Sequence, residues 1–149
     1  MNLTWPQPDP LPAPVRALFG QLRHAAEVRP VRCARGARLV HGEAGRERHG
    51  TRVRFSLCVH GEQLTRVRFR AYGCPYTLAA CEWVALRLES SGEDLRLAVQ
   101  TLGPPAEWAG ALQIPPDRLG RLLVIEDALT AALNELASVP ADNGMTESL

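Results

Sequence analysis

The sequence predicts an α+β domain in which helices cover one face of an antiparallel sheet. Apolar and polar residues alternate over residues 51–59 and again over residues 64–72, as in half-buried strands, and the four residues between them suit a hairpin turn. Long helical patterns follow these strands instead of alternating with them, which favours this architecture over a doubly wound parallel sheet. The chain has 149 residues and 46% hydrophobic content, enough for one domain with a substantial core.

The part of the chain before these strands predicts an extended lead-in, a helix and an edge strand. Prolines recur up to Pro14, and apolar residues then follow helical spacing over residues 13–27. Residues 38–43 are expected to form a short edge strand, and residues 44–50 a loop rich in glycine and charge. The expected organisation is a lead-in (residues 1–12), one domain (residues 13–139) and a flexible tail (residues 140–149).

Helices predicted after the strands supply the cover for the apolar face of the sheet. Apolar residues share one helical face over residues 75–89 and again over residues 122–136, and a smaller helix is expected over residues 93–101. Residues 103–116 predict a loop, because glycine and proline recur there. All long helices are therefore expected on one side of the sheet.

The opposite face of the sheet is predicted to carry a stripe of arginine side chains. A solvated sheet face is the simplest interpretation, because the net charge is only +1 and no aromatic residues interleave with the stripe to stack bases. Nucleic acid is therefore not an expected partner, and an acidic partner protein stays open. Because all 17 basic residues are arginine, a Schiff-base lysine is excluded. The stripe consists of Arg52, Arg54, Arg66, Arg68 and Arg70.

The sequence also predicts the cellular compartment of the protein and the redox state of its thiols. The sequence does not open with a basic start and an apolar run, and it has no run of eighteen apolar residues, so neither a secretory leader nor a membrane helix is expected. We expect a cytoplasmic protein with no membrane partner. There Cys33, Cys58, Cys74 and Cys81 should be reduced, and their irregular spacing predicts neither a disulfide framework nor a zinc ribbon.

The most informative chemical feature is Cys74, at the turn between a predicted strand and a predicted helix. Gly73 allows a sharp turn, and Pro75 suits the first position of a helix. Unpaired amides and the helix dipole at that position favour the thiolate, the form that binds metals and carries sulfur. A cysteine that only fills space is the alternative, and this pattern leaves both open. For Cys81, packing is the expected role.

Two segments together resemble a known family. Residues 69–81 read Phe-Arg-Ala-Tyr-Gly-Cys-Pro-Tyr-Thr-Leu-Ala-Ala-Cys, and residues 114–128 read Ile-Pro-Pro-Asp-Arg-Leu-Gly-Arg-Leu-Leu-Val-Ile-Glu-Asp-Ala. They are similar to the Tyr-Gly-Cys turn and the Pro-Pro segment of the IscU-type iron–sulfur cluster assembly scaffolds, equivalent to the N-terminal domain of NifU. The resemblance spans about residues 14–136. It implies a three-stranded antiparallel sheet with helices on one side, and a non-enzymatic protein.

The departures from this family concern its ligands. The family holds a cluster or a zinc ion with three cysteines and an aspartate or histidine, and only Cys74 is matched here. Gly120 and Arg121 stand where the family has His-Cys, and the region around residues 45–49 has no cysteine. An arginine beside Cys74 would stabilise a thiolate and repel a cation, which favours a sulfur or anion role over metal binding.

Other side chains are candidates to complete such a site. His49 lies in the loop that the resemblance brings toward Cys74, and imidazole is a competent ligand. The resemblance implies an iron–sulfur cluster or iron as cofactor, with zinc as another candidate and no cofactor if the ligand set is degenerate. The candidate ligands are Cys74 and His49, with Glu47, Arg121 and His41 as accessory candidates.

The resemblance also implies partners. A cysteine desulfurase would donate sulfur, other cluster-assembly proteins would bind, and a dedicated chaperone would recognise the segment Ile114, Pro115 and Pro116. Asp117 and Arg118 depart from the family there, which weakens the expected chaperone contact. The expected function is a scaffold-like protein that binds iron or sulfur through Cys74. The alternative is a metal-free adaptor or regulatory module that docks on assembly partners.

Overall fold

The structure, a computed structural model, describes residues 10–26 and 31–138. Residues 1–9 of the expected lead-in and the whole expected tail lie outside the described residues. In chain order the elements are α1 (Ala13–Phe19), β1 (Arg38–Arg46), the 3₁₀ turn η1 (Glu47–His49), β2 (Thr51–His60), β3 (Gln63–Tyr72), α2 (Pro75–Ser91), α3 (Leu95–Leu102), α4 (Pro105–Leu112), the 3₁₀ turn η2 (Pro116–Arg118) and α5 (Leu119–Ser138).

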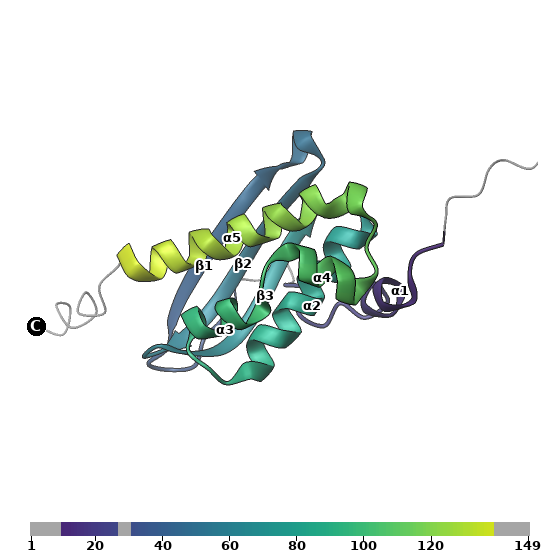
Figure 1. Cartoon of the computed structure of the whole chain (residues 1–149). Helices are drawn as coiled ribbons and strands as arrows, with labels where there is room; N and C mark the ends of the chain where they lie inside the picture. The colour runs from purple at the N-terminus through teal and green to yellow at the C-terminus, as the bar shows by residue number, and fades with distance from the viewer. Residues whose placement is uncertain (1–9, 27–30, 139–149) are drawn as a thin grey trace, which may run out of the picture.

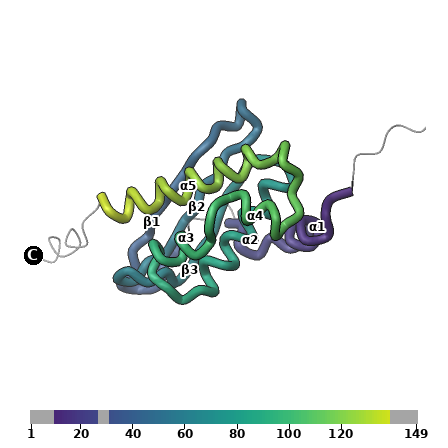
Figure 2. Tube along the Cα trace, viewed as in Figure 1, coloured from purple at the N-terminus to yellow at the C-terminus, as the bar shows by residue number. Residues whose placement is uncertain are grey.

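The predicted architecture is confirmed. The three strands form one antiparallel sheet in the order β1-β2-β3, and the helices lie on one side of it (Figure 1). The Cα trace in Figure 2 shows α5 crossing β1 and β2, which it contacts, while α2 packs on β3. The inward side chains of the strands are buried in the core, among them Val40, Val53, Phe55, Leu57, Val67 and Phe69. The strand alternation thus fixes which face the helices cover.

The edge strand and the first helix differ from their predicted lengths. β1 continues to Arg46, because Ala44 pairs with Val53 and keeps the apolar alternation on the inner face, so the expected loop shrinks to η1. α1 ends at Phe19, and the following chain pairs with β3 instead of continuing the helix. The Phe69 amide donates to the His24 carbonyl at 2.9 Å, and the Ala26 amide donates to the Phe69 carbonyl at 2.6 Å.

The loop predicted over residues 103–116 is wrong, because it contains α4. Pro105 occupies the first turn of this helix, where its missing amide hydrogen costs nothing. Trp108 is buried, and its indole Nε1 donates to the carbonyls of Leu102 and Gly103, each at 3.1 Å. Packing of Trp108 therefore holds a helix that glycine and proline content argues against.

The expectation that all four cysteines are reduced is also wrong. Cys33 and Cys58 form a disulfide bond, with their Cα atoms 5.4 Å apart. Cys58 points to the outer face of β2, and the segment that holds Cys33 lies against that face, where Arg66 donates to the carbonyl of Arg32 at 3.1 Å. The 25-residue separation gave no local signal of this contact.

Within the described residues, no helix combines the length and the apolar character that a membrane crossing needs.

Candidate functional site

Cys74 lies at the corner between β3 and α2. It is the N-cap residue of α2 in an extended conformation, and its carbonyl accepts the first helical hydrogen bond, from the amide of Leu78 at 3.1 Å. The preceding residue must be small, because a Cβ atom on Gly73 would lie 2.9 Å from the side chain of Thr77. The strand-to-helix turn predicted around Cys74 is therefore present, and it places the thiol beside the first amides of a helix.

The surroundings of Cys74 favour its thiolate. The thiol is partly buried, and burial alone would raise its pKa, but the amide and hydroxyl of Thr77, the amide of Tyr76 and the charge of Arg121 together lower the pKa below its ordinary value. The sulfur lies 3.6 Å from Oγ1 of Thr77. The role of Thr77 was not predicted from the sequence, although a hydroxyl three residues after a helix cap was the available signal.

Arg121 is the predicted accessory residue whose charge contributes to the lowered pKa of Cys74. It lies in the first turn of α5, and its Nε is buried with no hydrogen-bond partner among the described residues. A second guanidinium, that of Arg118, lies 5.5 Å from the ring centroid of Tyr76 at the start of α2. Positive charge around the start of α2 disfavours a cation there and favours an anion.

The other predicted ligands do not complete a metal site. Among residues 10–26 and 31–138, no group of three histidine, cysteine, aspartate or glutamate side chains is arranged to hold a metal ion. Glu47 is exposed, and its carboxylate lies 3.7 Å from Nη1 of Arg52. His41 lies in the middle of β1, with its Nδ1 3.0 Å from the hydroxyl of Ser56. Burial lowers the pKa of His41, the charge of Arg54 lowers it further, and the charge of Glu135 acts in the opposite direction.

His49 lies at the same end of the sheet as Cys74. It belongs to η1, which connects β1 to β2, and the pairing of Arg52 with Tyr72 places that turn beside the end of β3. His49 is exposed. Structural zinc and [2Fe-2S] clusters take about four protein ligands, which Cys74 and His49 alone cannot supply.

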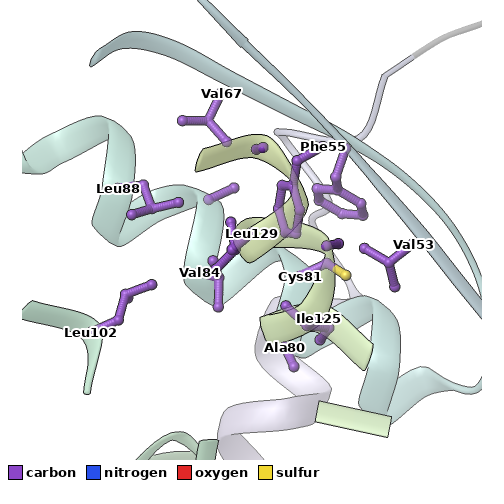
Figure 3. Close-up of a cluster of buried hydrophobic side chains, with 14 of the residues drawn as sticks. Val53, Phe55, Val67, Ala80, Cys81, Val84, Leu88, Leu102, Ile125 and Leu129 are labelled. Carbon is purple, nitrogen blue, oxygen red and sulfur yellow. The ribbon is translucent and has the colours of Figure 1, made fainter. Parts of the chain in front are cut away.

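The remaining cysteines are not available for this chemistry. Cys81 is fully buried and belongs to the same core cluster as Val53 and Ile125, which Figure 3 labels. Burial, with a smaller effect of Glu82, raises the pKa of Cys81 far above its ordinary value. The four cysteines all lie in described residues, and Cys74 is the one that is both free and partly exposed.

The chaperone-recognition-like segment is accessible only in part. Ile114 is 6% exposed and belongs to the core, Pro115 is half-buried, and Pro116 is exposed at the start of η2. A partner that binds this segment in the present conformation therefore meets the prolines and not the isoleucine.

A buried ionic network holds the N-terminal segment on α2, the helix whose N-cap is Cys74. Nδ1 of His24 lies 2.5 Å from Oε2 of Glu82, and the His24 amide donates to Oε1 of the same carboxylate at 2.8 Å. Nε2 of His24 lies 3.2 Å from Glu89, which also accepts from the Val67 amide at 2.7 Å and from Arg68 at 3.0 Å. This network was not predicted from the sequence, because His24 is 58 and 65 residues away from its two glutamate partners and no local pattern marks such a contact.

Known proteins are similar to this chain in sequence and in fold. No protein-family model matches the chain. The chain is 34% identical over 102 residues to the bifunctional protein NifU/MnmA of Rubrobacter xylanophilus, a match that covers 68% of this chain and 20% of that protein. The chain thus spans about a fifth of the length of this relative. The fold of this chain is similar to that in the crystal structure of a putative iron–sulfur cluster assembly scaffold protein for the SUF system from Fervidobacterium islandicum. The TM-score is 0.59 and the sequence identity 16%, and the match covers 81% of this chain and 94% of that one.

Proposed function

The chain is an IscU/NifU-like protein in sequence and fold, as its two motif segments predicted, and from this premise we propose that it acts in iron–sulfur cluster assembly through Cys74. In this proposal the chain is a scaffold-like protein and not an enzyme. It takes cargo from one partner and passes it to another. The cargo carried on Cys74 is sulfur, and iron or a cluster would need more ligands than the described residues bring together.

The observation that carries the proposal is the thiolate-favouring corner at Cys74. The first amides of α2, the Thr77 hydroxyl and Arg121 all lower the pKa of this thiol, and the same positive charge disfavours a bare metal cation. A thiolate is the nucleophile in sulfur exchange. The candidate donors do not form a three-ligand metal group within the described residues, which favours sulfur over iron as the direct cargo.

The sulfur-transfer step balances without a further reagent. The Cys74 thiolate attacks the outer sulfur of a persulfide on a cysteine desulfurase, and a new sulfur–sulfur bond forms on Cys74. The old sulfur–sulfur bond breaks, and the donor cysteine leaves as a thiolate. The persulfide proton stays on the transferred sulfur or passes to solvent. Arg121 stabilises the anionic group on Cys74 before and after the transfer.

The proposed partners are a cysteine desulfurase and the proteins that receive the sulfur, in the cytoplasm. A chaperone that reads Pro115 and Pro116 is the less supported partner, because Ile114 is buried and Asp117 and Arg118 depart from the family pattern. A metal-free adaptor that docks on the same partners is the competing function.

Sulfur loading of the full chain tests the proposal. The protein is incubated with a cysteine desulfurase and L-cysteine, and intact-mass spectrometry measures addition of one sulfur atom. We expect loading of the wild type and of Cys81→Ala, and none of Cys74→Ser. Parallel anaerobic reconstitution with iron and sulfide, read by visible absorbance and metal analysis, tests for a cluster. If desulfurase binds but the wild type acquires no sulfur, the adaptor function replaces this proposal. If a Cys74-dependent chromophore forms without sulfur loading, a cluster carrier replaces it.

A further inference from the structure

The sheet face that the helices leave open carries an unusual pair of charges. Arg54 of β2 lies directly opposite Arg70 of β3, and both side chains are exposed. Side chains that are directly opposite in an antiparallel pair have Cβ atoms about 5 Å apart, and like charges in this arrangement destabilise a sheet. This pair therefore costs stability unless a third group neutralises it.

The neighbouring carboxylates do not neutralise the pair. Glu43 of β1 lies opposite Arg54, but it binds Arg52 instead, with its Oε2 2.7 Å from Nε and 2.6 Å from Nη2. Glu47 also approaches Arg52, at 3.7 Å. Within the described ranges, no carboxylate lies within ion-pairing distance of Arg54 or Arg70. Two adjacent guanidiniums thus present unused hydrogen-bond donors to solvent.

These arginines line a cleft and not a flat surface. The cleft has a volume of about 260 Å³, and its walls include Arg54, Arg70, the Arg52 pair with Glu43 and Glu47, and Tyr72. Tyr72 is 55% exposed and pairs with Arg52 across the strands, so one aromatic ring stands at the end of the arginine stripe. This ring was not expected from the sequence at the arginine stripe. Arginine and tyrosine are the residue types enriched where proteins bind one another.

We propose that this cleft is a docking site for an acidic protein segment, in which an aspartate or glutamate carboxylate binds between Arg54 and Arg70. A carboxylate accepts paired hydrogen bonds from guanidinium groups, and such charge-assisted bonds are stronger than neutral ones. Its negative charge removes the repulsion between the two arginines. The Tyr72 ring offers an apolar surface and a hydroxyl to the rest of the segment. The inference does not depend on the role of Cys74.

The same cleft is a poor site for nucleic acid. A phosphate backbone carries charge at regular intervals and would meet Glu43 and Glu47 on the walls of the cleft. Binding of single strands also relies on several aromatic rings that stack successive bases, and this face offers Tyr72 alone among the described residues of the strands' outer side. A single carboxylate side chain fits this mixture of charges better than a polyanion does.

Fluorescence anisotropy with the full chain tests the docking site. The probe is a short labelled peptide of alternating glutamate and serine, titrated at low and at physiological salt, and a labelled oligothymidylate of equal charge is the comparison. We expect saturable peptide binding that weakens about tenfold or more in Arg54→Gln/Arg70→Gln, because hydrogen bonds to two charged groups are lost. Binding should stay within twofold of wild type in Arg23→Gln/Arg96→Gln, which removes the same charge from exposed positions outside the strands.

The competing outcomes are distinct. Equal weakening in both double variants would mean attraction by net charge alone and would overturn the proposal. Absence of saturable peptide binding, or tighter binding of the oligothymidylate than of the peptide, would overturn it as well. Thermal unfolding of the Arg54→Gln/Arg70→Gln variant is expected at the wild-type temperature or above it, since a like-charge pair is removed. No thiol chemistry enters the experiment, so its failure leaves the Cys74 proposal standing.

Discussion

Cys33 and Cys58 join the segment before β1 to the outer face of β2 by a disulfide bond. Next to this bond, the sulfur of Cys58 lies 3.8 Å from the carbonyl oxygen of Arg32. The guanidinium of Arg66 donates a hydrogen bond to the same carbonyl. Among the described residues, the segment before β1 is therefore held on the sheet by one covalent link and few hydrogen bonds. A reducing compartment would open this link.

Reduction of the disulfide should destabilise the fold without unfolding it. The bond closes a loop across 25 residues, and the chain-entropy model gives about 3.5 kcal/mol for a loop of that size. We expect the free energy of unfolding, measured by urea denaturation, to fall by about that amount when dithiothreitol is added. The Cys58→Ser variant should start at the lower value and not respond to dithiothreitol. Equal stability of the wild type with and without reductant would contradict the bond.

Substitution of Gly42 tests the contact between α5 and the sheet. A Cβ atom there would lie on the backbone of α5, 2.5 Å from the amide nitrogen of Ala132, and backbone cannot move aside cheaply. Gly42→Ala should therefore destabilise the protein by about 2 kcal/mol or more, the usual cost of overpacking. Gly110→Ala is the matched control, because nothing lies within 4 Å of its added Cβ and alanine favours the helix by about 1 kcal/mol. Thermal unfolding should shift down for the first variant and slightly up for the second.

The fold was predictable where local pattern and tertiary structure agree. The alternation in β2 and β3, and the helical spacing in α2 and α5, identified elements whose bounds differ from the structure by at most a few residues. α4 was missed because its proline and glycine content indicates a loop, while burial of Trp108 decides its conformation. α1 was predicted too long because the pairing of His24 and Ala26 with Phe69, a non-local contact, ends the helix early.

The candidate site was predictable only in its local part. The corner at Cys74 follows from neighbouring residues, and Arg121 followed from the alignment of a second segment with a known family. The link between Cys33 and Cys58 and the network around His24 join segments 25 to 65 residues apart, and no local pattern marks such contacts. The repulsion between Arg54 and Arg70 also needed the strand register, since the stripe alone does not show which arginines lack a carboxylate.

Acid should weaken the ionic network through Glu89. Burial alone would raise the pKa of this carboxyl, but the Val67 amide, His24 and Arg68 lower it below its ordinary value of 4.5. A carboxyl with a lowered pKa in the folded state stabilises the fold above its ordinary pKa, and this contribution is lost as the pH falls through the folded-state value. Glu89→Gln should therefore unfold at a lower temperature than wild type at pH 7, by about 1 kcal/mol in stability.

The difference in unfolding temperature between wild type and Glu89→Gln should shrink as the pH falls below about 4.5. Thermal unfolding followed by circular dichroism from pH 7 to pH 3 measures it. Glu62→Gln is the control, since Glu62 is exposed in the β2–β3 turn with no ion pair to another described residue. A constant difference at all these pH values would show that the network acts by packing and not by the charge of Glu89.

The reactivity of Cys74 should report its thiolate. Because the amides of α2, Thr77 and Arg121 lower the pKa of Cys74 below its ordinary value of 9.0, alkylation by iodoacetamide should reach half its maximal rate below pH 9.0. Arg121→Gln should move that midpoint upward, while Arg96→Gln should leave it unchanged because Arg96 is not among the groups that act on this thiol. With the disulfide intact, Cys81 should react only after denaturation, since it is fully buried. Cys74 and Cys81 lie in one tryptic peptide, residues 71–87, so fragment-ion mass spectrometry of this peptide locates the alkylated thiol. A wild-type midpoint at or above pH 9.0 would remove the electrostatic basis of the proposed sulfur transfer.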